Sequence, residues 1–218
     1  MREDGREGDV FSLIGPKRYD APWKDIESQG WIAPADCTEV RVQLTEAERM
    51  VYATAEQSEK YRLAATTPTK TKVVRKIMEM HPDEPTLIIG AYVDQLEEIA
   101  EELDVPVIDG KTGNAKREKL YQQFRDGELQ TLVVSKVANF SIDLPGASVA
   151  IQISGTFGSR QEEAQRLGRI LRPKPDGGEA FFYSIVARDT LDADYAAHRQ
   201  RFLAEQGYGY RIVDSFDL

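Results

Sequence analysis

The chain has 218 residues, of which 41% are hydrophobic, and a formal net charge of -9 at pH 7. This length and apolar share suffice for a domain with a substantial core, and no apolar run approaches the length of a membrane span. The acidic balance argues against a general polyanion binder, because nucleic-acid-binding proteins usually show a basic excess.

The first part of the chain is predicted to pass from a connector into a helical segment. Residues 1–36 are polar, contain several glycines and prolines, and lack a sustained hydrophobic period, which is typical of a connector. Residues 40–44 alternate like a strand. Thr45 followed by Glu48 has the form of a capping box, which predicts a helix through about Arg62.

From Lys70 onward, helical and strand patterns alternate. Strands that alternate with helices imply crossover connections, so we expect an α/β fold with a doubly wound, mainly parallel sheet and helices on both faces. The predicted strands are residues 86–90, 105–108, 131–134, 149–153 and 180–186. The predicted helices are residues 70–80 and 93–103, a helix that Asn114 caps and that stops at Gly127, and residues 190–206.

Cys37 is the only cysteine, so no intrachain disulfide can form, and the single thiol fits a reducing, cytoplasmic setting. We expect Cys37 to be a small buried side chain. His81 and His198 are far apart in the sequence, so the spacing of a structural zinc site is missing.

Functional residues should lie at the carboxyl ends of the parallel strands. Three polar loops follow predicted strands, at residues 110–113, 135–139 and 155–159. Gly110-Lys111-Thr112 resembles the end of a phosphate-binding loop, but that motif needs a glycine where this chain has Val105. Two alternatives stay open for the first loop: backbone N–H groups and Lys111 that contact a phosphodiester, or a plain turn.

Asp143 precedes Leu144-Pro145, between one predicted strand and the next. An aspartate in this setting is usually only a turn former. Its position also allows a role in binding a ribose or in a catalytic cleft, and the residues alone do not decide between the two.

The segment from Gln165 to Arg172 places three arginines along one predicted short helix. Arg169 and Arg172 are three residues apart, so they are neighbours on one helix face. Arginine is always charged and donates hydrogen bonds from a planar fork, which suits a clamp for the charge that develops during phosphoryl transfer. The alternative is a solvated basic face.

Together these segments resemble motifs five and six of superfamily two helicases, and most closely those of the XPB family of DNA repair and transcription helicases. The likeness covers nearly the whole chain. It is carried by residues 13–19, Trp23, residues 135–145, 151–154 and 165–172, and residues 199–208.

The resemblance implies that residues 39–218 are the second RecA-like motor domain of a two-domain helicase, with a thumb-like helical segment at about residues 45–69. Residues 1–38 would be the tail of the first motor domain and the connector between the domains. Arg2-Glu3-Asp4 is similar to a family motif near the end of that first domain, so we expect the chain to begin just past a domain boundary. Family members hold ATP and Mg²⁺ mainly on the first domain, through a phosphate-binding loop and an acidic motif.

The resemblance also assigns roles to individual residues. Arg169 and Arg172 would be arginine fingers that reach ATP across the cleft, supported by Gln165 and Arg166, and such fingers can be worth on the order of 10³ or more in rate. The residues expected on the nucleotide side are Asp143 and Gly168, and those expected on the DNA-strand side are Gly110, Lys111, Thr112, Ser135 and Lys136.

Two departures from the family pattern bear on these roles. Ala138 stands where relatives commonly have glycine. Gln161-Glu162 stands where relatives have an arginine–glutamine pair, so Gln161 and Glu162 are assigned no role. The cations of the thumb-like segment, Arg49, Lys60 and Arg62, are opposed by Glu46, Glu48, Glu56 and Glu59, which argues against a strong DNA grip there.

The predicted function is therefore the C-terminal half of an ATP-driven DNA helicase, 3′ to 5′ by resemblance, acting in nucleotide excision repair in the nucleoid-associated cytoplasm. Its expected partners are DNA and the first motor domain, and the isolated chain is expected to be inactive. One alternative is a double-stranded DNA translocase of the remodeller type. The other is a docking module for a repair nuclease, with Tyr195, Phe202 and Tyr208 as contacts.

Overall fold

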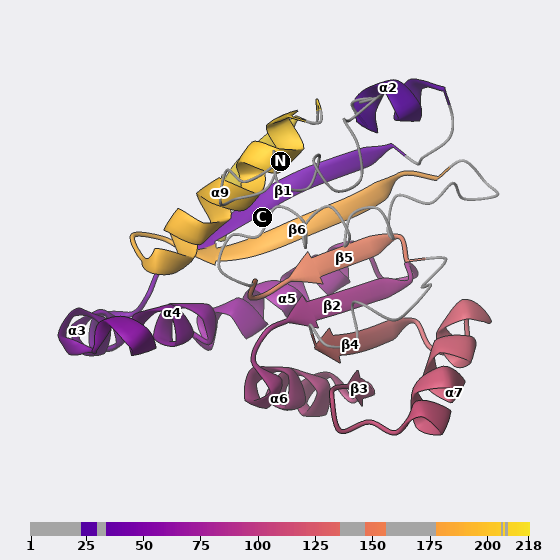
Figure 1. Ribbon diagram of the computed structural model, residues 1–218, viewed down its shortest axis with the longest axis horizontal. Coiled ribbons are helices and arrows are strands. Elements are labelled where there is room, and N and C mark those ends of the chain that lie inside the picture. The colour runs from indigo at the N-terminus through magenta and orange to yellow at the C-terminus, as the bar shows by residue number, and fades with distance from the viewer. Residues whose placement is uncertain (1–22, 30–33, 136–146, 156–177, 206, 208) are drawn as a thin grey trace, which may run out of the picture.

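The computed structural model describes residues 23–29, 34–135, 147–155, 178–205, 207 and 209–218. At its centre is a seven-stranded sheet with the order β3-β4-β2-β5-β6-β1-β7, in which each recorded strand pair is parallel (Figure 1). The strands are β1 (Ala35–Val42), β2 (Thr86–Gly90), β3 (Val107–Ile108), β4 (Thr131–Ser135), β5 (Val149–Gln152), β6 (Ala180–Ala187) and β7 (Tyr210–Asp214).

Helices connect the strands and cover both faces of the sheet. On one face, the core cluster includes Val73 and Ile77 of α5 with Leu96 and Ile99 of α6. On the opposite face, Tyr121 of α7 is fully buried in a second cluster. The helices are α2 (Trp23–Ser28), α3 (Glu46–Thr54), α4 (Gln57–Ala65), α5 (Thr69–Met80), α6 (Val93–Leu103), α7 (Asn114–Arg125) and α9 (Leu191–Glu205).

The helix α9 lies on the same face as α7. Gln200 of α9 donates a hydrogen bond to Glu39 of β1, whereas the next residue of β1, Val40, faces the core cluster of α5 and α6. Successive side chains of a strand point to opposite faces, so α9 and α5 lie on opposite sides of β1. The prediction of a parallel α/β sheet with helices on both faces is confirmed.

The helical pair α3 and α4 corrects one sequence prediction, because the expected single helix is interrupted. Ala55 (ψ 152°) and Glu56 (ψ 147°) are extended and form the end of α3 and the start of α4. The capping box itself is confirmed: the N–H of Glu48 donates to the Thr45 hydroxyl, and the Glu48 carboxylate accepts from the N–H of Thr45. The pair projects beyond the carboxyl ends of the strands (Figure 1).

The connector predicted for residues 1–36 is wrong at two places within the described residues. Trp23–Ser28 is helical, and β1 begins at Ala35, where it pairs with β6, while its next residues also pair with β7. The strand predicted at residues 40–44 is the second half of β1, and its first half was missed because that part is polar, although Cys37, Thr38 and Glu39 are buried between the neighbouring strands. The burial expected for Cys37 is confirmed, at 1% exposure.

Smaller differences have local causes. The strand predicted for residues 105–108 contains only Val107 and Ile108, because Pro106 has no N–H to give to a neighbouring strand. Gly113, not Asn114, is the N-cap of α7. β7 was not predicted. None of the helices in the described ranges is both long enough and apolar enough to cross a membrane.

Candidate functional site

The carboxyl ends of the parallel strands bring three predicted site segments to one edge of the sheet. Residues 109–112 follow β3, Ser135 ends β4, and Gly155 follows β5. β3 and β4 are neighbours, whereas β2 lies between β4 and β5. For these described segments, the topology places the residues where an open parallel sheet binds its ligands.

The turn after β3 is organised around the carboxylate of Asp109. Its Oδ1 accepts hydrogen bonds from the Thr112 hydroxyl (2.7 Å) and from the backbone N–H groups of Lys111 (3.1 Å) and Thr112 (2.9 Å). The bond from the Thr112 hydroxyl, with help from those two N–H groups, lowers the pKa of Asp109 below its usual value. The two N–H groups thus serve the turn, which leaves the exposed Lys111 side chain to reach a ligand.

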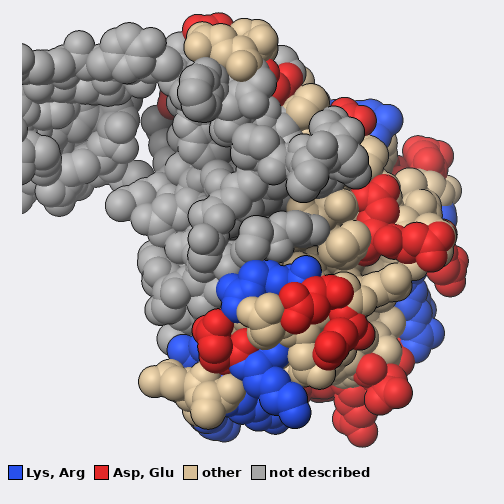
Figure 2. All heavy atoms as spheres, turned by 90° about the vertical axis from the view of Figure 1, so that its right-hand side faces the viewer, with Lys and Arg blue, Asp and Glu red and all other residues tan. Residues whose placement is uncertain are grey.

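The cations beside this turn differ in whether they are exposed or hydrogen-bonded within the turn. Lys111 and Lys116 are exposed, whereas Arg117 donates to the carbonyl oxygens of Asp109 (3.3 Å) and Thr112 (3.1 Å). Figure 2 shows basic and acidic side chains intermixed over the described part of one face, with no continuous basic surface there. Such a surface suits a small number of phosphate contacts.

Ser135 lies at the end of β4, opposite Gly90 in the register of the sheet. Its side chain is 1% exposed, and its hydroxyl has no hydrogen-bond partner among the described residues. Buried hydroxyls are usually hydrogen-bonded, so this one is a position where an additional polar partner would be accommodated.

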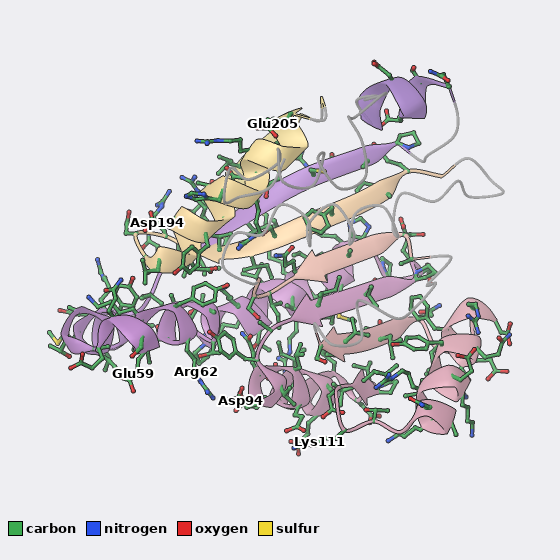
Figure 3. All side chains as sticks on the ribbon, viewed as in Figure 1. Glu59, Arg62, Asp94, Lys111, Asp194 and Glu205 are labelled. Carbon is green, nitrogen blue, oxygen red and sulfur yellow. The ribbon has the colours of Figure 1, made fainter. Side chains whose placement is uncertain are left out.

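The cations of α4 are engaged within the fold. Arg62 forms an ion pair with Asp94 at the start of α6 and lies over the Tyr92 ring, 5.4 Å from its centre. Figure 3 shows the Arg62 and Asp94 side chains approaching one another at the lower side of the molecule. Lys60 lies 5.4 Å from the centre of the Tyr52 ring. Arg62 and Lys60 are thus both engaged in contacts within the described part of the fold.

A buried ion cluster lies under the ends of β5 and β6. Lys70 of α5 donates to Asp192 Oδ2 (2.6 Å) and to the carbonyl oxygen of Ile153 (2.7 Å). Asp192 Oδ2 also accepts from the N–H of Ala187 (3.0 Å), and its Oδ1 lies 4.0 Å from Arg199 Nη2. Lys70 and Asp192 are 0% exposed and Arg199 is 3% exposed, so the cluster is closed to solvent.

The electrostatics of this cluster follow from burial. Desolvation lowers the pKa of Lys70, and the adjacent Asp192 carboxylate opposes that shift. Burial also raises the pKa of Tyr61 of α4, which lies close to the cluster, so its hydroxyl stays protonated. The cluster is therefore a set of closely packed buried charges beneath the carboxyl ends of β5 and β6.

The Tyr61 hydroxyl holds the residue that follows the end of β5. It donates to the carbonyl oxygen of Gly155 and accepts from the N–H of Gly155 (3.1 Å). The Tyr61 ring packs edge-on against Tyr195 of α9, with ring centres 4.8 Å apart, and lies 6.2 Å from the Tyr92 ring. One side chain thus joins α4, β5 and α9.

Several predicted site residues lie outside the described residues. These are Lys136, Asp143, Gln165, Arg166, Gly168, Arg169 and Arg172. Of the three aromatic residues named for a docking role, Tyr195 is partly buried against Tyr61, and the side chains of Phe202 and Tyr208 are outside the described set. Among the described residues, no cluster of His, Cys, Asp or Glu is arranged to hold a metal ion.

Sequence reasoning missed the buried cluster and the Tyr61 contact. One signal was present: Lys70 stands at i, with Val73, Val74 and Ile77 at i+3, i+4 and i+7, so it occupies the buried stripe of α5. A lysine at such a position needs a buried partner. The partner, Asp192, lies 122 residues away along the chain and could not be identified by spacing.

Comparison with known proteins extends this picture. The family model described as "ERCC3/RAD25/XPB C-terminal helicase" matches residues 26–217. The chain is 72% identical over 218 residues to a protein of Mycobacterium tuberculosis named "DNA 3'-5' helicase XPB". The match covers 100% of this chain and 40% of that protein. It is 37% identical to the Saccharomyces cerevisiae "General transcription and DNA repair factor IIH helicase/translocase subunit XPB/SSL2", over 98% of this chain and 26% of that protein.

Among solved structures, the chain is similar to one described as S. cerevisiae Dbp5 bound to RNA and ADP BeF3. That match has a TM-score of 0.67 at 14% identity and covers 100% of this chain and 50% of the other. At this identity the likeness concerns the fold, which is the RecA-like fold of helicase motor domains. Because the family model spans nearly all of the sequence and the fold agrees with it, the chain belongs to the ERCC3/RAD25/XPB C-terminal helicase family.

Proposed function

We propose that this chain is the C-terminal motor domain of an ATP-dependent DNA helicase that moves 3′ to 5′ and acts in nucleotide excision repair. The observation that carries the proposal is the family match over residues 26–217, together with a relative of 72% identity that is named a 3'-5' DNA helicase. The chain spans about two fifths of that relative's length, so the remaining part of the helicase, including the first motor domain, would come from the full-length protein.

The nucleotide site would be shared between two motor domains. The described turn at residues 109–112 does not fit a phosphate cradle, because the N–H groups of Lys111 and Thr112 donate to Asp109. ATP, held with Mg²⁺ mainly by the first motor domain, would supply the phosphoryl group that is transferred to water. From this chain, Arg169 and Arg172 would stabilise the charge that develops there, with Gln165 and Arg166 in support.

The remaining nucleotide contacts would come from Asp143 and Gly168. This division of roles means that the isolated chain neither holds ATP tightly nor hydrolyses it. Closure of the two domains would complete the ATP site. Reopening after hydrolysis would move the two domains along a DNA strand.

DNA would contact the same strand ends from outside. The exposed Lys111 side chain supports this role directly. Gly110, Thr112, Ser135 and Lys136 belong to the same strand-end loops and are proposed to line the path of the strand.

The S. cerevisiae relative is named a helicase/translocase, which favours translocation along duplex DNA as a second candidate activity. Strand-displacement assays on the full-length protein separate the two activities.

The proposed fingers are tested by Arg169→Ala and Arg172→Ala in the full-length protein. We expect each variant to lose DNA-stimulated ATP hydrolysis by on the order of 10³ while ATP affinity and thermal stability stay near wild type. Arg75→Ala is the matched control, because Arg75 is an exposed arginine of α5 paired with Glu102. Near-normal turnover in both finger variants would show that the assignment is wrong.

A further inference from the structure

The backbone of Gly155 is held by a single side chain from another element. The Tyr61 hydroxyl donates to the carbonyl oxygen of Gly155 and accepts from its N–H. Two hydrogen bonds to the same residue fix both its position and the orientation of its peptide groups. Tyr61 is 5% exposed, so water does not compete readily for these bonds.

Gly155 is also closely packed on its other side. A Cβ atom at this position would lie 2.8 Å from Arg199 Nη1 and 2.8 Å from Gln152 Nε2. Both side chains are buried, at 3% and 1% exposure, so a side chain at position 155 would have to displace buried polar groups. Arg199 also belongs to the buried ion cluster with Asp192, so the packing around Gly155 is continuous with that cluster.

Tyr61 comes from a helical pair whose buried residues all lie on α4. No residue of α3 is buried, and α4 buries Tyr61, Ala64 and Ala65. The Tyr52 hydroxyl of α3 accepts from the N–H of Leu191 at the start of α9. Among the described contacts of α3 and α4 with the rest of the fold, the Tyr61 hydroxyl is the one that reaches the residue after the end of β5.

We propose that Tyr61 is a positioning residue that couples α3 and α4 to the end of β5. The coupling rests on the proposed function, because the chain leads in sequence from Gly155 to Arg169 and Arg172. The Tyr61 hydroxyl holds the Gly155 peptide against α4, and it thereby fixes the residue from which the chain continues toward those arginines.

The test is Tyr61→Phe in the full-length protein, which removes only the hydroxyl and keeps the ring contacts with Tyr195 and Tyr92. We expect kcat at saturating DNA to fall about tenfold, the size of effect expected when a buried hydrogen-bonded group is lost. KM for ATP should stay within about twofold. In hydrogen–deuterium exchange, the peptide that contains Gly155 should exchange faster, because its N–H loses an acceptor.

Tyr92→Phe is the matched control. The Tyr92 ring lies near both Tyr61 and Arg62. The control therefore also removes one tyrosine hydroxyl from this region, but it leaves the hydrogen bonds between Tyr61 and Gly155 intact. It should leave kcat and the exchange of Gly155 near wild type.

Three outcomes count against the coupling. DNA-stimulated kcat within twofold of wild type in Tyr61→Phe overturns the inference alone. Equal losses in Tyr61→Phe and Tyr92→Phe also overturn it, because the effect is then general to the region. A wild-type protein whose ATP hydrolysis does not respond to DNA overturns the proposed function, and the inference with it.

Discussion

At the scale of single residues, the charges that matter most to stability are those that the fold encloses. A buried ion pair contributes little net stability by itself, because desolvation of two charges offsets their attraction. Removal of one partner is costly, because it leaves the other charge buried without compensation. Lys70 and Asp192 are in this situation, with the second cation, Arg199, 4.0 Å from Asp192.

Lys70→Met should therefore lower the free energy of unfolding of the chain by about 3 kcal/mol. Urea denaturation followed by circular dichroism measures this. Lys72→Met is the control on the same helix, and because Lys72 is exposed we expect a change within about 0.5 kcal/mol. Equal costs for the two variants would show that Lys70 is not a buried partner of Asp192.

The sequence could predict single residues only where a local pattern defines them. The capping box of Thr45 and Glu48 is a three-residue spacing, and it was found correctly. The contact of Tyr61 with Gly155 spans 94 residues and depends on how α4 lies across the sheet edge. No local pattern contains that information.

At the scale of elements, the predictions succeeded where burial imposes a strong pattern. β2, β4 and β5 are buried along their whole length and read as continuous apolar runs. The break between α3 and α4 was missed because Ala55 and Glu56 have good helix propensity, and because α3 buries no residue that would mark its limits. The conformation there follows from contacts with the rest of the fold.

The start of α3 depends on its cap more than on packing. Thr45→Ala removes the hydroxyl that accepts from the N–H of Glu48, and it should lower the stability of the helix by about 1 kcal/mol. Hydrogen–deuterium exchange of α3 measures this, with faster exchange expected in residues 46–54. Ser58→Ala, at an exposed position of α4, should leave that exchange unchanged. Unchanged protection in Thr45→Ala would contradict a stabilising cap.

At the scale of the whole molecule, we propose that the chain contributes one part of a site that it shares with another domain. The sheet places residues 109–112, Ser135 and Gly155 at a common edge, and the family match extends over nearly all of the sequence. We propose that the partner surface belongs to a first motor domain that precedes β1, with the sheet that contains β1 (Ala35–Val42) as part of the second motor domain. This division explains why the described residues hold the strands and exposed cations of a motor domain but no phosphate cradle in the turn after β3.

The central claim, that this chain completes a shared ATP site, is tested most directly by mixing it with the N-terminal segment of the full-length protein. ATP hydrolysis is measured for each part alone and for the mixture, with and without DNA. We expect neither part alone to show DNA-stimulated turnover, and the mixture to recover it unless Arg169 and Arg172 are both replaced by alanine. Full DNA-stimulated activity in the N-terminal segment alone, or in a mixture that contains the double variant, would contradict the claim.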